Sequence, residues 1–354
     1  MRTQSTTARY PGARPAFSIV ELLVVFFIIG MVLSILVPAI SGVRQSARKA
    51  STSALMKDLQ TASNQFSADR NGTTPGYFSP QQMGSRDNRD RGFTAMQNVL
   101  LDLAGGVVSN GTRNLSDPCS DAGAIIEVGP EAGADKVVRV SLNAIGSPTK
   151  DLSRGTDVRA YFNPAQSGFV KFCTTESRAT NVDDHRALPE LVDAWGNPIL
   201  AWQRDDRGGA SSAFAAEDSQ TVARFYWNSN AGILNARAVG RSLRDHNQYA
   251  AGGLYSLIGG GAMSSSPQNV VGNSGNSGAL AALLGNPAFP VPGNPSPAQP
   301  ASARGGLVFH SAGIDGWFLS SEDKGARAVQ QQLRYTPIDD PISLFDDVVI
   351  SVLN

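Results

Sequence analysis

Hydrophobic positions form one long run near the N-terminus and short groups elsewhere. Residues 17–40 read FSIVELLVVFFIIGMVLSILVPAI and are almost entirely apolar. A helix of this length would measure roughly 36 Å at about 1.5 Å per residue, and the hydrocarbon core of a bilayer is about 30 Å thick. The pattern therefore predicts a membrane-spanning helix. Glu21 interrupts it, and a carboxylate in hydrocarbon is costly enough to need a partner or a purpose.

After Ser41 the pattern changes from continuous to amphipathic. Apolar residues recur at steps of three and four through Phe66, and charged residues take the other faces. We expect one helical stem over 17–69, ended by Asn71-Gly72, with a globular head packed on its second half. A free coiled coil is the alternative, but the repeat lasts too few heptads to favour it.

The head is expected to mix short helices and strands. Residues 71–92 read as a polar loop, and 93–104 as a helix that Gly105-Gly106 ends. The strands expected from apolar runs between turn residues are 124–128, 137–142, 157–162, 168–173, 199–202, 307–309 and 348–352. Several short strands separated by turns favour an antiparallel sheet over the stem, so the fold class is α+β.

Composition changes sharply in one internal segment. Residues 203–303 look like an insertion, because no acidic or basic side chain occurs between Asp245 and Arg304 and the segment is rich in Gly, Ser, Asn and Pro. Such a composition favours a long surface loop, with a loop that contacts a partner as the alternative. The expected head then comprises 70–202 and 304–354.

Charge and motif content exclude several classes of protein. The 354 residues include 30 basic and 30 acidic side chains, which argues against a basic nucleic-acid-binding face. No nucleophile elbow, P-loop, His-Glu-x-x-His or cysteine metal pattern occurs. The three histidines, at 185, 246 and 310, stand in unrelated contexts and are expected to be structural or on the surface. We therefore expect no enzyme.

The N-terminal residues carry a family signature. Residues 1–16 contain three arginines and no acid, and Ala16 is followed by Phe17-Ser-Ile-Val-Glu21 and the apolar run. This arrangement resembles the type IV pilins and the pseudopilins of type II secretion, over about residues 14–60. Their signature is a basic leader, a small residue, Phe-Thr-Leu-Ile-Glu and an apolar helix. The family usually has Gly where this chain has Ala16.

The resemblance implies a processing and assembly pathway. A prepilin peptidase/methylase would cut between Ala16 and Phe17, and Glu21 would pair with the Phe17 amine of a neighbouring subunit. Gly30 and Pro38 fall where the family has helix-weakening residues, which implies local unwinding when subunits pack. The implied partners are other pilin subunits and an inner-membrane assembly platform. The implied location is the bacterial inner membrane with a periplasmic head, and then a pilus or pseudopilus.

Other readings of the N-terminus stay open. An ordinary secretory signal could be cut after Ala39, since Val37 and Ala39 suit the small-residue rule. A plain single-pass anchor is a second alternative. The expected function is accordingly a structural, pilin-like subunit. The alternatives are a minor, cargo-contacting subunit and a membrane-anchored binding protein or enzyme that never assembles.

Two segments of the head resemble the major type II pseudopilin. Residues 193–198, Asp-Ala-Trp-Gly-Asn-Pro, resemble its Asp-Pro-Trp-Gly-Asn-Pro turn, although a simple turn with an aromatic plug would read the same way. Residues 311–316, Ser-Ala-Gly-Ile-Asp-Gly, with acids downstream, resemble its calcium loop. The candidate calcium ligands are Asp315, Glu322, Asp323, Asp346 and Asp347. The alternative is a set of solvated acidic turns.

The two cysteines are the remaining candidate chemistry. Cys119 and Cys173 could form a disulfide, because a pair of thiols outside the cytoplasm tends to oxidise. Two free buried thiols are the alternative.

Overall fold

The computed structural model describes most of the N-terminal helix and the ordered parts of the head. The residues that it describes are 18–83, 93–109, 115, 123–131, 136–147, 149–151, 156–164, 191–204, 230, 283–285, 304–326 and 340–352. They divide into two compact units, with the boundary between Ala47 and Arg48. The expected strand 168–173 and both cysteines lie outside the described residues.

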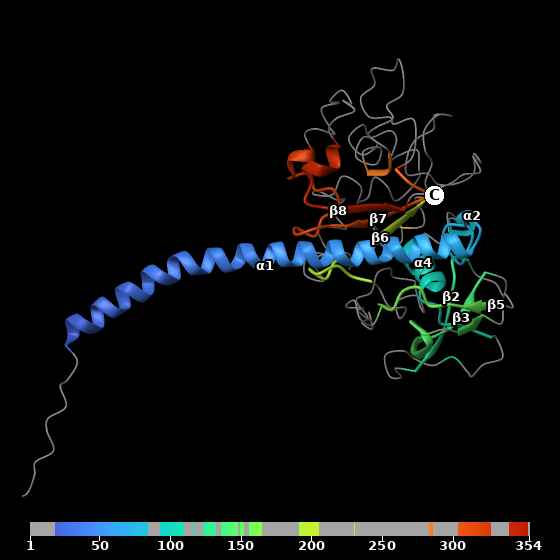
Figure 1. Ribbon diagram of the computed structural model, residues 1–354, viewed down its shortest axis with the longest axis horizontal. Helices are drawn as coiled ribbons and strands as arrows, with labels where there is room; N and C mark the ends of the chain where they lie inside the picture. Colours follow the sequence, from blue (N-terminus) through green and yellow to red (C-terminus); the bar gives the residue numbers. More distant parts are fainter. Residues whose placement is uncertain are drawn as a thin grey trace, which may run out of the picture. The chain divides into compact units, whose positions relative to one another are not determined.

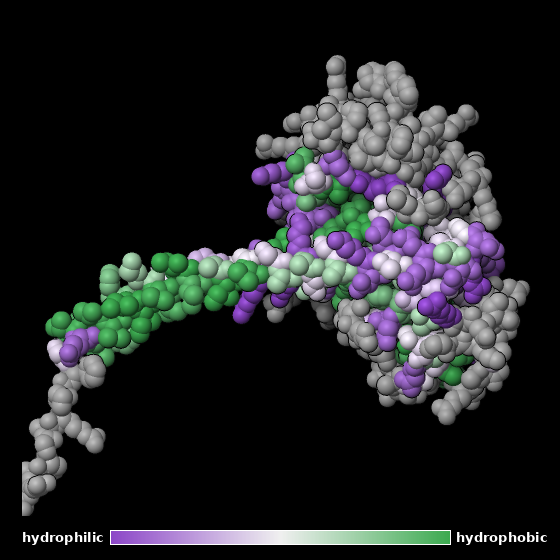
Figure 2. Space-filling view, in the orientation of Figure 1, coloured by the Kyte–Doolittle hydropathy of each residue, from purple (hydrophilic) through white to green (hydrophobic). Residues whose placement is uncertain are grey.

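Helix α1 (Ile19–Asp69) is a single element of 51 residues, which confirms the predicted stem (Figure 1). Its side chains are exposed from Ile19 through Ser51, and Figure 2 shows a hydrophobic surface along the N-terminal part of the helix. The helix is long and apolar enough to cross a membrane. It ends where predicted, because Asn71 and Gly72 adopt left-handed backbone angles (φ 54° and 80°) that stop a helix.

The second half of α1 belongs to the head and supplies part of its first core. Most described members of this core come from α1, from helix α4 (Ala95–Leu103) and from strands β6 (Leu200–Gln203), β7 (Leu307–Ser311) and β8 (Val348–Val352). Phe162, Leu191 and Ile199 join them from connecting segments. Met56 and Leu59 are fully buried. Apolar side chains at three- and four-residue spacing thus explain why the helix holds the head.

Strands β6, β7 and β8 form an antiparallel sheet in the order β6-β7-β8. A second antiparallel sheet has the order β1-β3-β2, from Val107–Val108, Val138–Ser141 and Ile125–Val128. Strands β4 (Thr149–Asp151) and β5 (Thr156–Val158) pair antiparallel. Short 3₁₀ helices cover Leu142–Ala144 and Pro341–Leu344. The predicted α+β class with antiparallel sheets is confirmed at this level.

Helix α4 connects the two cores of the head. Its start is fixed by a capping box, in which Thr94 and Gln97 exchange bonds of 3.0 and 3.1 Å with each other's backbone. All nine of its residues are buried, including polar ones. Asn98 bonds both backbone groups of Phe78, and Asp102 accepts the Gly76 N–H. The second core gathers Phe78, Met83 and Phe93 with the β1-β3-β2 sheet.

The structure corrects two expectations about loops. The expected polar loop 71–92 contains helix α2 (Pro80–Met83), and Phe78 and Met83 are buried in the second core. Arg204 of the 203–303 insertion is exposed, but Asn230, Leu283 and Leu284 lie inside the head, because they are at most 1% exposed. Arg304 helps to hold this segment: its Nε donates to the Leu283 carbonyl at 3.1 Å. A purely superficial loop is therefore wrong for these positions.

Candidate functional site

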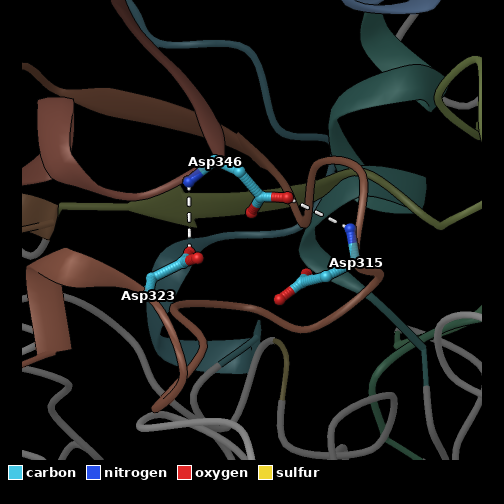
Figure 3. Close-up of side chains that lie close together, drawn as sticks. All are labelled: Asp315, Asp323 and Asp346. Carbon is cyan, nitrogen blue, oxygen red and sulfur yellow. Dashed lines mark hydrogen bonds between the residues drawn. The ribbon is translucent and has the colours of Figure 1, made fainter. Parts of the chain in front are cut away.

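Three of the predicted acidic residues converge at one end of the β6-β7-β8 sheet. Asp315 lies in the turn after β7, Asp323 in the turn that follows Ser320, and Asp346 two residues before β8. One carboxylate oxygen from each lies within 4.8 Å of the others. Figure 3 shows Asp346 between the other two side chains.

Backbone amides hold these carboxylates in place. Asp346 Oδ2 accepts the N–H groups of Ile314 (2.9 Å) and Asp315 (3.1 Å), and the Asp346 N–H donates to Asp323 Oδ2 at 3.1 Å. Asp315 Oδ1 accepts the Trp317 N–H at 2.8 Å. The three acids are thus fixed by their own loops, and mutual repulsion does not separate them.

Close approach of the backbone requires a glycine beside the cluster. Gly313 has φ 71°, and a Cβ there would lie 2.6 Å from the Asp346 carbonyl oxygen and 2.9 Å from its Oδ1. Only glycine combines this left-handed angle with so little space. The glycine of the predicted Ser-Ala-Gly segment therefore positions Asp315 against Asp346.

The electrostatics of the cluster favour either protons or a cation. Burial and the neighbouring charge of Asp315 raise the pKa of Asp346 to about 7. Burial, with smaller contributions from Asp347 and Asp323, raises the pKa of Asp315 to about 6. A divalent cation would remove this repulsion.

The arrangement meets a simple geometric test for such an ion. Calcium–oxygen distances are about 2.3–2.6 Å, so two ligands of one ion lie no more than about 5 Å apart, and these oxygens are all within 4.8 Å of one another. Asp346 Oδ1 is buried and has no hydrogen-bond partner among the described residues. An unsatisfied carboxylate oxygen at the centre of the cluster is what a hard cation would coordinate.

The other two predicted ligands lie elsewhere. Glu322 is exposed and is not part of the cluster. Asp347 is buried, lies outside the three-carboxylate group, and bonds His310 Nε2 at 2.6 Å. Burial raises the pKa of Asp347, and the hydrogen bond and charge of His310 partly offset this effect. Glu322 and Asp347 are therefore not part of the three-carboxylate cluster, and their role as ligands stays a prediction.

Asp347 has a structural task of its own. Its carboxylate also accepts the Leu319 N–H, at 3.2 and 3.0 Å. Leu319 adopts φ 49°, which is uncommon for a residue with a side chain. Asp347 therefore holds the loop between Asp315 and Asp323 in a bent conformation, and His310 holds Asp347.

The second sequence motif is bonded to the same loop. In the turn at 193–197, Asp193 Oδ1 accepts the N–H groups of Trp195 and Asn197, both at 2.9 Å. The Ser311 hydroxyl donates to Asp193 Oδ2 at 2.7 Å, and Asn197 Nδ2 donates to the Gly313 carbonyl at 3.1 Å. Burial raises the pKa of Asp193, and these bonds oppose the rise. The turn is thus hydrogen-bonded to the loop after β7, whereas the sequence suggested only a turn with an aromatic plug.

The same turn contacts the stem helix. The Ala194 N–H donates to Thr52 Oγ1 at 3.1 Å, and Thr52 is fully buried. A continuous set of hydrogen bonds therefore runs from α1 through the turn to Gly313, next to the acidic cluster.

The assembly residues have a simpler setting. Ala16 and Phe17 lie outside the described residues. Glu21 accepts the Ser18 N–H at 3.0 Å. Helix α1 continues without a break through Gly30 and Pro38 in the single chain. A Cβ at Gly30 would meet nothing within 4 Å, so no contact within the chain requires a glycine there.

The chain was compared with protein-family models, with curated proteins and with solved structures, and none of the three comparisons gave a match.

Sequence reasoning missed three participants in these networks. His310 was expected to be structural or on the surface but was given no partner, and neither were Ser311 and Asn197. The His310–Asp347 contact depends on the register of β7 against β8, in which Ser311 faces Val348. The contacts of Ser311 and Asn197 depend instead on how the 193–197 turn packs against the end of β7. The Ser18–Glu21 bond is different, because a serine three residues before a glutamate is a readable helix-start signal.

Proposed function

We propose that the protein is a structural, pilin-like subunit that is processed by a prepilin peptidase and assembles into a type IV pilus or type II secretion pseudopilus. The observation that carries the proposal is the dual character of α1. One unbroken helix has an exposed apolar first half and a second half that forms part of the head's core.

Helix continuity favours this function over the alternatives. Cleavage after Ala39 would divide α1 near the end of its apolar half and remove most of its exposed apolar side chains. A plain anchor would need the apolar segment but gives no reason for the acid within it, since Glu21 is the one charged side chain between Ser18 and Val43. In a filament, the apolar halves of many copies would cover one another, and Glu21 would face the Phe17 amine of a neighbour.

We propose further that Asp315, Asp323 and Asp346 bind a divalent cation, with calcium as the first candidate. The support is the convergence of three carboxylates, the raised pKa values of two of them and the unsatisfied Asp346 oxygen. The ion would neutralise the cluster and fix the loop that follows β7. Its role would be structural stabilisation of the head.

Processing is tested by the mass of the mature chain. We expect the protein extracted from membranes to begin at Phe17, with or without an added methyl group, and intact mass spectrometry reports both. Mutation of Ala16 to a bulky residue should leave the leader in place. A mature chain that begins at Ile40 would contradict the proposal and support an ordinary signal peptide.

Assembly is tested with Glu21→Ala. The variant should insert at least as readily as wild type, because the segment becomes more apolar. It should form few filaments, since an unpaired buried amine costs about 3–5 kcal/mol at each contact. Asp58→Ala, which removes an exposed acid from the same helix, is the matched control and should assemble normally. Equal filament yield from wild type and Glu21→Ala, compared in sheared and membrane fractions, would refute the proposed assembly mechanism.

A further inference from the structure

Helix α1 opens with a reciprocal pair of hydrogen bonds. Ser18 precedes the first helical residue, Ile19, and Glu21 follows three positions after Ser18. The Ser18 N–H donates to Glu21 Oε2 at 3.0 Å, and the Val20 N–H donates to Ser18 Oγ at 3.3 Å. This is a form of the capping box, in which two amides without backbone acceptors are satisfied by side chains.

The cap meets two needs at once. The first four N–H groups of a helix lack intrahelical partners, and no water is available to them in a bilayer core. Among the described residues, the Ser18 N–H is the one hydrogen-bond donor to Glu21, and no cationic side chain lies in this half of the helix before Arg44. The bond to Ser18 gives the carboxylate a donor at the positive end of the helix dipole. These interactions within the chain offset part of the free-energy cost of placing the Glu21 carboxylate in hydrocarbon.

We propose that Glu21 exchanges partners on assembly. In the unassembled subunit its carboxylate caps its own helix through the Ser18 amide, and in the filament it leaves this amide for the α-amine of a neighbouring subunit. The second half of this proposal rests on the proposed function, and the first half does not. Ser18 is then a positioning residue that keeps Glu21 at the helix start until a stronger, charged donor arrives.

The cap is tested in the precursor that retains its leader, where the Phe17 nitrogen is still a peptide nitrogen and cannot compete as an amine. Amide hydrogen exchange is measured by NMR on the full chain in detergent micelles. Ser18 has no helical acceptor, so its protection reports the bond to Glu21. We expect its amide to exchange about tenfold faster in Glu21→Ala, as befits loss of a bond to a charged acceptor.

Ser18→Ala is the matched control. It keeps the amide that Glu21 accepts and removes the hydroxyl that Val20 donates to. The amide at position 18 should stay protected while that of Val20 exchanges faster. Equal exchange at Ser18 in wild type and Glu21→Ala would overturn the cap, and so would equal loss of protection at both amides in Ser18→Ala, which would indicate general fraying.

The exchange is tested in filaments assembled from two labelled populations. One carries nitrogen-15 at the Phe17 amine and the other carbon-13 at the Glu21 carboxyl, and solid-state NMR detects contacts between them. We expect this contact between subunits and loss of the contact between Glu21 and its own Ser18. A Glu21 carboxyl that stays on Ser18 in the filament would overturn the exchange. Failure of wild type to form any filament would refute the proposed function and the exchange together, while the precursor result would still decide the cap.

Discussion

The acidic cluster should make the metal-free head less stable at neutral pH than in mild acid, and Asp346→Asn should remove most of this dependence. The pKa of Asp346 is about 7 in the folded protein against an ordinary 3.8. The folded state therefore binds more protons than the unfolded chain between these values. The free energy of unfolding should be highest near the lower value and should fall as pH rises through about 7.

The size of the effect follows from the same difference. At about 1.4 kcal/mol per pKa unit, the rise in the pKa of Asp346 from 3.8 to about 7 corresponds to about 4 kcal/mol of unfolding free energy. Asp346 is only half-buried, so solvent screening reduces the figure to about 2 kcal/mol. For a domain of this size, that is a change of about 4–8 °C in melting temperature. Asp315, whose pKa is about 6, adds to the same trend over a lower pH range.

The assay is thermal unfolding of the full chain in detergent micelles with a chelator, at pH 4.0 and pH 7.5. Tryptophan fluorescence is a suitable signal, because Trp317 lies in the loop between Asp315 and Asp323. Other groups titrate as well. The quantity compared is therefore the difference in melting temperature between the two pH values, measured for wild type and for Asp346→Asn. The asparagine keeps an oxygen for the Ile314 and Asp315 amides and removes the charge.

Calcium and a control variant separate the possible causes. At pH 7.5 calcium should raise the melting temperature of wild type and leave Asp346→Asn nearly unchanged. Glu322→Gln removes an exposed acid outside the cluster and should behave as wild type in both respects. If Asp346→Asn retains the full pH dependence, the reasoning from a strained acidic cluster is wrong. A calcium response that is equal in both proteins would refute the cation site.

Further predictions concern the packing of the head. Leu59→Ala should lower the free energy of unfolding by about 2–5 kcal/mol, because Leu59 is fully buried. Urea denaturation measures this loss. Lys57→Ala, at an exposed position of the same helix, is the control and should stay within about 0.5 kcal/mol of wild type. Asn197→Ala should cost about 1–3 kcal/mol by leaving the Gly313 carbonyl without this buried donor. An unchanged urea midpoint in Asn197→Ala would show that the 193–197 turn does not fasten the loop.

Local sequence patterns predicted the elements of the fold well where one signal dominated. The stem followed from a continuous apolar run and then a helical repeat, and its end from Asn71-Gly72. Strands β2, β3 and β8 followed from apolar runs between turn residues, and they appear at Ile125–Val128, Val138–Ser141 and Val348–Val352. Each of these predictions uses only neighbours along the chain.

Long-range packing explains the misses. No partners were predicted for the polar side chains of the helix expected over 93–104, yet Asn98 and Asp102 are buried because the backbone at 76–78 supplies their partners. Leu283 and Leu284 lie in a segment whose composition favours a surface loop, yet two apolar residues are enough to insert into the head. Neither contact has a local signature, since the partners are distant in sequence.

The acidic residues show how close sequence reasoning came and where it stopped. Asp346 and Asp347 were taken as one pair, but consecutive residues that enter a strand point to opposite faces. Asp346 therefore reaches the cluster, whereas Asp347 turns inward to His310. The period of two was available from the predicted strand 348–352, so one of the two could have been excluded as a ligand. Which one to exclude depends on the face that packs against β7, and that requires the register of the folded sheet.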